Sequence, residues 1–558
     1  MVLDAAAVEL EPGGAAVDRT HQVIHVLDQH GVEQFGEVQV PAGAEVLTLR
    51  THKPDGRTLE PERGGDGKGS TSLAGLEPGD YVELEYLRGT RGDGTGFAAD
   101  PFFFRAEGSR LFRSSYAVSA PAGLGLELDA HGMAAPEPVR EDGRVVVRAL
   151  ALDVPARVAE PGAPPITELM PFLHVGVGGG REALHLALAD AAADRARPTE
   201  ELRALAARIR ASAGPGADAV ALVRAASAHV AKNVLGQGGA FGDEASVVLS
   251  RGRGSRLLVL KALLSALGVR ARIALARPFA ADQSAWRFPS HGLYGQPLLR
   301  VEAGAETLWL DPGLRIAPFA TLPSAVSDVE ALLLPEPGEA LEVVRTPART
   351  RVEERREVVV RIDLAADGSA EIEGEDRYHG AAGAAAKSAV ERLDASERRQ
   401  LIESMLARSF RGVELTEAAM LGEDDPEGPL VVRWRGRVPR LARALGPGGA
   451  GGLVIDAPVL PSRLGARFVQ MAVRTAPLLL QIPERLAQRV EIRAPEGLVP
   501  VAGGPRTIAS PFGAFSRTET VDGRTLVREH RLDLSRGRIA PERYPDFAAF
   551  AASVDGSE

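Results

Sequence analysis

Short runs in which apolar and polar residues alternate fill the first part of the chain. These runs are residues 23–27, 45–49, 81–86 and 145–147. Successive side chains of a strand point to opposite faces, so an alternating run buries one face and exposes the other. Turn sequences such as Asp142-Gly143 separate the runs. Several short strands at this spacing predict a β-sandwich-like domain over residues 1–158.

The period of the apolar positions changes after the proline-rich stretch at 160–165. Apolar residues then recur every three or four positions, which predicts helices at about 181–193, 199–211 and 218–233. A further apolar run at 255–267 begins at Ser255, a good helix N-cap, and ends before Gly268. Strand-like runs follow at 269–275, 298–302 and 307–310. We therefore expect an α+β domain over 159–330, with a helical lead-in at 181–233 and a core at 245–323.

From residue 345 onward, apolar residues again alternate with polar ones at every second position. A hairpin is predicted at 358–373 around Asp367-Gly368. Further strands are predicted at 430–434, 466–473, 490–494 and 526–534. A helical pattern at about 384–409 interrupts them. These patterns predict a β-rich third domain at 345–558, and the chain as a whole is expected to be a multidomain α+β protein.

Composition narrows the functional classes. The net charge of −10 disfavours nucleic-acid binding, which needs a basic surface. The chain contains no cysteine, which excludes disulfides, thiolate metal sites and a thiol nucleophile. No stretch of about 18 apolar residues predicts a membrane span. The first ten residues lack a signal-peptide pattern, so the sequence alone favours the cytoplasm, unless it is part of a longer protein.

No cofactor or metal site is predicted. The glycine-rich stretches at 176–180 and 252–255 do not have the spacing of a phosphate-binding loop. His21 and His25 lie on one face of a predicted strand, where they are either metal ligands or, more simply, surface histidines.

The segment 251–312 resembles the core of a bacterial transglutaminase-like domain, a relative of papain-like enzymes. In that family a cysteine opens the helix, a histidine begins the next strand, and an aspartate closes the following strand, often as Trp-Leu-Asp-Pro. Trp309-Leu310-Asp311-Pro312 matches the last motif. The cysteine position falls at Arg253 or, with a slip of two residues, at Ser255, and the histidine position falls at Gln296. Only Asp311 keeps the family's residue type.

The flanking regions carry further resemblances. The motifs at 53–56 and 76–83 resemble a β-rich domain of unknown function that commonly precedes transglutaminase-like domains. The segments 474–478 and 539–544 are similar to the β-domain that often follows them. The resemblance implies a bacterial protein associated with the cell envelope or periplasm.

Two different functions remain open at this point. The loss of cysteine and histidine predicts a pseudoenzyme that acts as a scaffold or protein- or peptide-binding component of a bacterial assembly. A tentative binding groove includes Arg251, Arg253, Arg256 and Trp309, although solvated arginines explain the same pattern. The alternative is a serine-based hydrolase or acyltransferase that uses Ser255, His291 and Asp311. The simpler interpretation of these residues is that Ser255 is a helix N-cap and His291 is an exposed loop residue.

Overall fold

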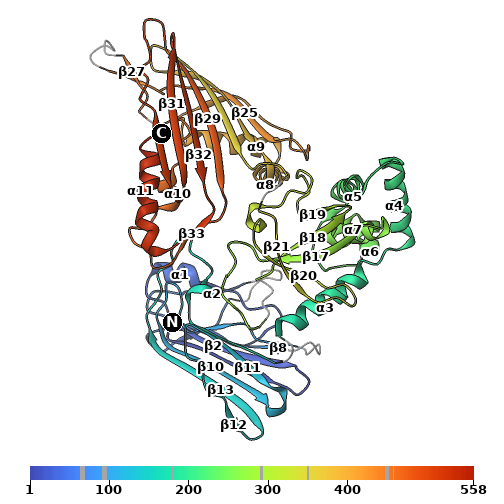
Figure 1. The fold of residues 1–558 in the computed structure, drawn as a ribbon. Helices are drawn as coiled ribbons and strands as arrows, with labels where there is room; N and C mark the ends of the chain where they lie inside the picture. The colour runs from blue at the N-terminus through green and yellow to red at the C-terminus, as the bar shows by residue number, and fades with distance from the viewer. Residues whose placement is uncertain are drawn as a thin grey trace. The chain divides into compact units, whose positions relative to one another are not determined.

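The computed structural model describes residues 1–62, 70–90, 97–177, 180–288, 293–348, 351–445, 452–456 and 458–558. The chain divides into two compact units (Figure 1). The first comprises Met1–Glu160, Pro165–Ala187 and Asp282–His291. The second comprises Pro161–Pro164, Leu188–Ala281 and Gly292–Glu558. Helices and several separate sheets are both present, so the prediction of a mixed α and β protein is confirmed.

The first unit contains two main sheets. The eight-stranded sheet has the order β12-β13-β10-β1-β2-β7-β4-β5. Its strands are β1 (Leu3–Leu10), β2 (Ala16–His25), β4 (Glu45–His52), β5 (Thr58–Leu59), β7 (Tyr81–Thr90), β10 (Leu111–Pro121), β12 (Val139–Glu141) and β13 (Arg144–Val154). The smaller sheet contains β8 (Phe97–Ala98), β9 (Phe102–Phe103), β11 (Leu126–His131) and β14 (Phe172–Val177). Short elements complete the unit: α1 (Gln29–Phe35), β3 (Glu37–Val38), β6 (Thr71–Ser72), the 3₁₀ turn Ala122–Leu124 and α2 (Ile166–Leu169).

One hydrophobic core joins these two sheets. Val118 of β10 and Leu173 of β14 belong to the same cluster, and both are fully buried. Alternate residues of β10 point into this core, as the pleat of a strand requires. Packing of two sheets around a shared core is the arrangement that the sandwich prediction requires.

The predicted boundary at residue 158 is wrong, because the first unit continues beyond it. Strand β14 pairs with β11 in antiparallel register from Leu126↔Val177 to His131↔Phe172. After the proline-rich stretch at 160–165, the chain returns to complete the smaller sheet. A pairing between segments this far apart leaves no local pattern in the sequence.

The second unit begins with a helical region around a five-stranded sheet of order β19-β18-β17-β20-β21. The strands are β17 (Arg270–Ala276), β18 (Gln296–Ala303), β19 (Glu306–Leu310), β20 (Glu330–Leu333) and β21 (Glu342–Arg345). The helices are α3 (Gly180–Arg195), whose first part belongs to the first unit, α4 (Glu200–Ala213), α5 (Ala219–Asn233), α6 (Ala245–Arg251) and α7 (Arg256–Ala266). A short pair, β15 (Leu235–Gly236) and β16 (Arg253–Gly254), and the 3₁₀ turn Ser324–Val326 complete this region.

Helix α7 is the central helix of this region. Seven of its residues are buried: Leu257, Leu258, Val259, Leu260, Ala262, Leu263 and Leu264. It contacts α4, α5, α6 and β17, so nearly its whole circumference is covered. This explains why its sequence is apolar all round, without the polar stripe of a surface helix.

The remainder of the second unit is built on another eight-stranded sheet, of order β24-β25-β23-β22-β29-β32-β31-β30. Its strands are β22 (Arg356–Leu364), β23 (Ala370–Tyr378), β24 (Glu414–Leu421), β25 (Leu430–Val438), β29 (Glu484–Arg493), β30 (Arg506–Ser510), β31 (Gly513–Asp522) and β32 (Thr525–Leu534). The accompanying helices are α8 (Gly380–Val390), α9 (Ala395–Ala407), α10 (Leu464–Phe468) and α11 (Tyr544–Asp555). Short elements are β26 (Arg443–Ala444), β27 (Leu453–Val454), β28 (Leu478–Leu480), β33 (Gly537–Ile539) and the 3₁₀ turn Pro541–Arg543.

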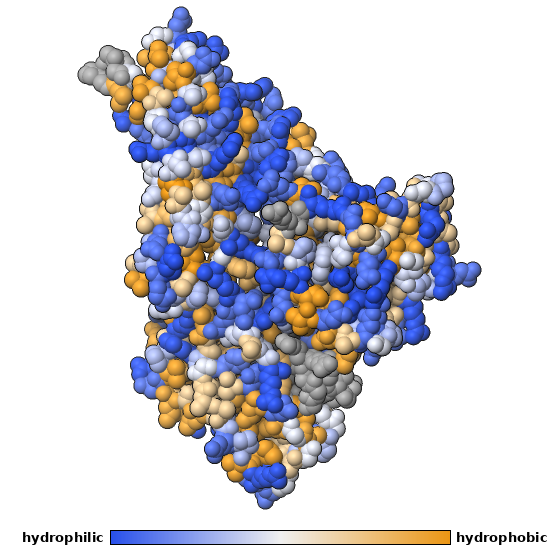
Figure 2. Space-filling view, viewed as in Figure 1, coloured by the Kyte–Doolittle hydropathy of each residue, from blue (hydrophilic) through white to orange (hydrophobic). Residues whose placement is uncertain are grey.

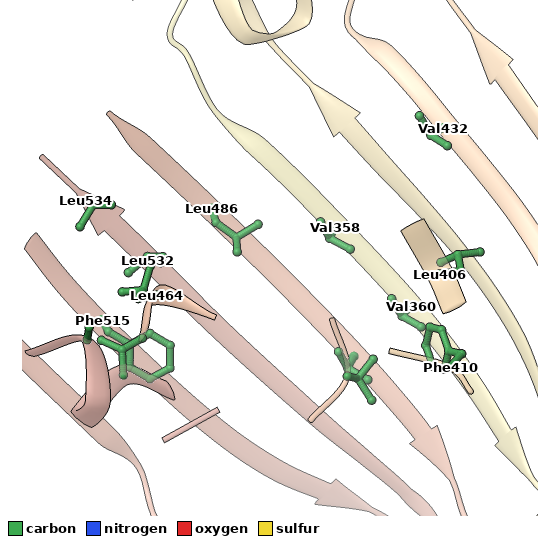
Figure 3. Close-up of a cluster of buried hydrophobic side chains, with 14 of the residues drawn as sticks. Val358, Val360, Leu406, Phe410, Val432, Leu464, Leu486, Phe515, Leu532 and Leu534 are labelled. Atoms are coloured by element: carbon green, nitrogen blue, oxygen red, sulfur yellow. The ribbon is translucent and has the colours of Figure 1, made fainter. Parts of the chain in front are cut away.

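The two faces of this sheet differ. One face contributes Val358, Val360 and Leu532 to a hydrophobic cluster that also contains Leu406 and Phe410 (Figure 3). The opposite face carries ion pairs between neighbouring strands, such as Arg361–Glu373, Arg433–Glu375 and Arg489–Glu529. In the view of Figure 2, hydrophilic residues gather over the strands near β25 and β29. The alternation of apolar and polar residues in the sequence therefore corresponds to one buried face and one solvated face of the sheet.

Two predicted elements of this region are wrong. The single helix at 384–409 is two helices, because Asp394 and Glu397 form a capping box that starts α9 anew. The strand predicted at 466–473 is α10 followed by a loop. The carboxylate of Asp555 accepts hydrogen bonds from the backbone N–H groups of Leu464 and Gly465, and this contact with α11 holds the first turn of α10. Among the described residues, no helix has both the length and the apolar character needed to cross a membrane.

Acid is expected to destabilise this region through His530. Burial, and then the charges of Arg528 and Arg517, lower the pKa of His530 to about 4 from 6.5. The contribution of neutral His530 to stability is therefore complete above pH 6.5. It is lost as the pH falls toward 4, because protonation of this histidine favours the unfolded chain. Denaturant unfolding at pH 7.5 and 4.5 should show wild type losing about 2 kcal/mol more than His530→Gln over this interval. Equal losses in both proteins would contradict the assignment.

Candidate functional site

Ser255 lies at the start of α7, where its side chain is fully engaged. Its Oγ accepts a hydrogen bond from the Leu258 N–H at 3.4 Å and donates to the carbonyl oxygen of Ala240 at 2.5 Å. The residue is only 5% exposed. A hydroxyl that caps a helix and donates its hydrogen to a carbonyl is not presented as a nucleophile.

Gln296 and Asp311 lie together because their strands are neighbours. Gln296 begins β18, and Asp311 follows directly after β19, which pairs antiparallel with β18. The Nε2 atom of Gln296 donates to Oδ2 of Asp311 at 3.1 Å. The backbone N–H of Gly313 donates to Oδ1 at 2.8 Å. The glutamine amide and the backbone N–H of Gly313 thus each donate to one carboxyl oxygen of Asp311.

Asp311 is a perturbed carboxyl group. It is 9% exposed, and burial raises its pKa from 3.8 to about 6. The hydrogen bonds from Gly313 and Gln296 and the positive charge of Arg256 oppose this shift without cancelling it. Desolvation therefore dominates the electrostatics of this position.

Arg256, the first residue of α7, reaches the same place as Asp311. Its Nη2 donates to the carbonyl oxygen of Gly313 at 2.9 Å. Burial lowers the pKa of its guanidinium, and the charge of Asp311 acts in the opposite direction. Its Nη1 atom is buried and has no hydrogen-bond partner among the residues that the structure describes.

The other predicted groove residues lie elsewhere. Arg251 is exposed and contacts Asp243 at 3.3 Å. Arg253 is exposed in β16. Trp309 is 9% exposed and packs in a hydrophobic core cluster with Leu298 and Leu322. The structure therefore does not gather the three arginines and Trp309 on one surface, and Arg256 alone faces the aspartate.

His291, the base of the alternative triad, lies outside the described residues. No hydrogen bond within the described ranges joins Ser255 to Asp311. The histidines of β2 have separate contacts: His21 lies 3.0 Å from a carboxylate oxygen of Glu83, and His25 stacks on Tyr81. Over the part of the chain that the structure describes, no group of three metal-ligating side chains converges.

A cavity of about 540 Å³ opens beside Arg256 and Asp311, within the second unit. Its apolar wall includes Val230, Ala231, Leu260, Leu310, Ile316 and Phe319. Its polar lining includes Ser227, Arg256, Asp311, Arg315 and Thr321. At its rim, Arg224 contacts Glu427 at 2.6 Å and lies over the ring of Phe319. The volume is in the range of pockets that bind small organic ligands.

Sequence reasoning missed Ser227, Arg315 and Thr321. Ser227 lies on α5, whereas Arg315 and Thr321 belong to the loop that follows Asp311. A single polar residue in a helix or a loop has no distinguishing local pattern. For Arg315 and Thr321, the available signal in the sequence is their position shortly after the Trp-Leu-Asp-Pro motif. Ser227 has no such signal.

Comparisons with known proteins support a shared fold. Residues 457–557 match DUF3858, described as a domain of unknown function with a solved structure. No curated protein matches the sequence. The chain is similar to a solved structure described as a putative protease from Parabacteroides distasonis ATCC 8503, with 14% identity, a TM-score of 0.64, and coverage of 100% of this chain and 97% of that one. At this identity the similarity shows the fold over the whole chain and does not extend to activity.

A second solved structure is described as a putative cysteine protease from Cytophaga hutchinsonii. The match has 14% identity and covers 39% of this chain and 78% of that one. Its TM-score of 0.17 is too low to support a structural argument. The comparisons thus show the overall fold, and residues 457–557 match the model of a domain of unknown function.

Proposed function

We propose that this chain is a degenerate, non-catalytic transglutaminase-like protein with a papain-like central domain, which binds a protein or peptide as a component of a bacterial assembly. The observation that carries the proposal is the hydrogen bond from Gln296 to Asp311. In the resembling family this place belongs to a histidine base. An amide holds the aspartate but does not accept and release protons near neutral pH.

The nucleophile side of the site supports the same proposal. The sequence has no cysteine, and the hydroxyl of Ser255 is committed to Leu258 and Ala240. Arg256 links the start of α7 to the loop after Asp311 through its hydrogen bond to the carbonyl oxygen of Gly313. A guanidinium in this position attracts an anionic ligand but performs no acyl transfer.

A serine hydrolase remains the alternative. It requires the Ser255 hydroxyl to leave Ala240 and His291 to approach both Ser255 and Asp311. A chain similar in fold is described as a putative protease, and that description is the reason to test this alternative directly.

A fluorophosphonate probe is expected to leave Ser255 unlabelled, because its buried N-cap hydroxyl donates to the Ala240 carbonyl and contacts no base among the described residues. The measurement is mass spectrometry of the chymotryptic peptide that contains Ser255, after incubation of the full chain with the probe. Ser255→Ala gives the background, and His291→Ala reports any role of the loop histidine. Labelling that both substitutions abolish would establish the hydrolase and reject the non-catalytic proposal.

A further inference from the structure

The cavity beside Asp311 contains an unusual set of unsatisfied groups. Four buried side-chain atoms of its lining have no hydrogen-bond partner within the described ranges: Ser227 Oγ, Arg256 Nη1, Arg315 Nε and Thr321 Oγ1. Thr321 is only 3% exposed. Buried polar groups are normally paired with protein groups, ordered water or a ligand, so four orphaned atoms around one cavity mark it as a place where a bound polar group would complete their bonding.

The chemistry of these four atoms restricts the ligand. The guanidinium nitrogens of Arg256 and Arg315 donate only, and the two hydroxyls donate or accept. A ligand that satisfies all four must therefore present acceptor oxygens. The acceptor groups of the lining are less available, because Asp311 already accepts bonds from Gln296 and Gly313.

The charges around the cavity point to a single negative charge on the ligand. Arg315 is paired with Glu391, and Arg224 is paired with Glu427. Within the described part of the chain, Arg256 has no ion pair within 4.0 Å. The exposed Lys232 and the exposed Asp424 lie at the rim and offset each other. The half-buried guanidinium of Arg256, whose charge the carboxyl of Asp311 partly offsets, suits a monoanion better than a phosphate dianion.

The rest of the ligand is apolar. Leu260, Leu310 and Ile316 line the cavity, and the ring of Phe319 forms part of the same wall. These residues come from α7, the end of β19 and the loop after it, so the apolar wall and the donors meet in one place. The side chain attached to the anionic group is therefore expected to be a hydrocarbon or an aromatic ring.

We infer that this cavity binds the carboxylate of an apolar acid, in particular the free C-terminus of a peptide that ends in an apolar residue. Nη1 of Arg256 and the hydroxyl of Thr321 donate to the carboxylate oxygens, and the apolar residues receive the terminal side chain. The peptide source rests on the function proposed above, whereas recognition of a free carboxylate does not.

Isothermal titration calorimetry of the full chain tests this inference with three probes: Ac-Ala-Ala-Phe-OH, its C-terminal amide, and 3-phenylpropanoate. We expect the peptide acid to bind at least tenfold more tightly than the amide. Arg256→Gln should weaken binding of the acid at least tenfold and leave the weak amide binding unchanged. Arg210→Gln is the matched control, because Arg210 donates to the Leu267 carbonyl at the other end of α7.

Thr321→Val provides a second test that does not depend on Arg256→Gln folding. It removes an orphaned hydroxyl while keeping the shape of the side chain, so the melting temperature should hold or rise. The affinity for the acid should fall three- to tenfold. Equal binding of acid and amide, or wild-type affinity in both variants, would overturn the inference.

The probes also separate this inference from the proposed function. If peptides bind but a free carboxylate confers no advantage, peptide recognition stands and the carboxylate site is rejected. If 3-phenylpropanoate binds in an Arg256-dependent manner and neither peptide binds, the carboxylate site stands and peptide recognition is rejected. If none of the three probes binds, the carboxylate site is rejected.

Discussion

Replacing Asp311 with asparagine is expected to stabilise the protein by about 2–3 kcal/mol at pH 7.5. The carboxyl is buried, and its pKa is raised to about 6 from 3.8. The folded chain therefore binds this proton more tightly than the unfolded chain does. The stabilising contribution is complete below pH 3.8, falls as the pH rises to 6, and is lost above that value. Asparagine keeps Oδ1 as the acceptor for Gly313 and removes the charge that burial disfavours, and Gln296 turns its amide so that its Oε1 accepts from the new Nδ2.

The measurement is urea-induced unfolding of wild type and Asp311→Asn at pH 7.5 and pH 4. The difference between them should shrink to less than about 1 kcal/mol at pH 4, where wild type is protonated in the folded state. Asp243→Asn is a matched control on an exposed carboxylate paired with Arg251, and it should change stability by less than about 0.5 kcal/mol. A destabilised Asp311→Asn at pH 7.5 would mean that the attraction between the Asp311 carboxylate and the positive charge of Arg256 outweighs desolvation.

Replacing Phe547 with alanine is expected to destabilise the C-terminal β-rich region by about 3–5 kcal/mol. Phe547 lies on α11, is 0% exposed, and packs edge-on against Phe512 with ring centroids 5.4 Å apart. Its removal leaves a cavity in the cluster that joins α11 to the sheet, and the close packing of the surrounding residues limits how far the cluster can collapse.

Phe112→Ala is the matched control for this substitution. Phe112 is 54% exposed, so the same chemical change there should cost less than about 0.5 kcal/mol. Chemical denaturation followed by tryptophan fluorescence and far-ultraviolet circular dichroism compares both variants with wild type. A Phe547→Ala protein as stable as wild type would show that α11 contributes little to this core.

The helix at 255–267 shows that a local sequence pattern can predict the bounds of a single element. Its apolar run, the N-cap at Ser255 and the stop at Gly268 predicted α7 within one residue at each end. The strands predicted at 269–275 and 307–310 also agree closely with β17 and β19. Each of these elements is specified by periodicity and capping, which are properties of a short window of sequence.

The site was predicted less completely. The spacing placed Gln296 and Asp311 at the ends of strands, and the structure joins them by a hydrogen bond. Of the four predicted groove residues, Arg256 is the side chain that reaches the loop after Asp311. One residue turns a helix by about 100°, so spacing along the sequence did not show which of the neighbouring side chains faces the aspartate.

The sequence by itself determined that the chain has no thiol chemistry, that β-rich regions flank a mixed central region, and that only the aspartate of the resembling motif remains. Only the tertiary structure decided that β14 completes the first unit and that Arg256, Thr321 and Ser227 line one cavity. The physical reason is the distance along the chain over which each kind of interaction acts. Period and capping act between neighbours in the chain, whereas strand pairing, burial and the orphaned donors depend on residues brought together from distant segments.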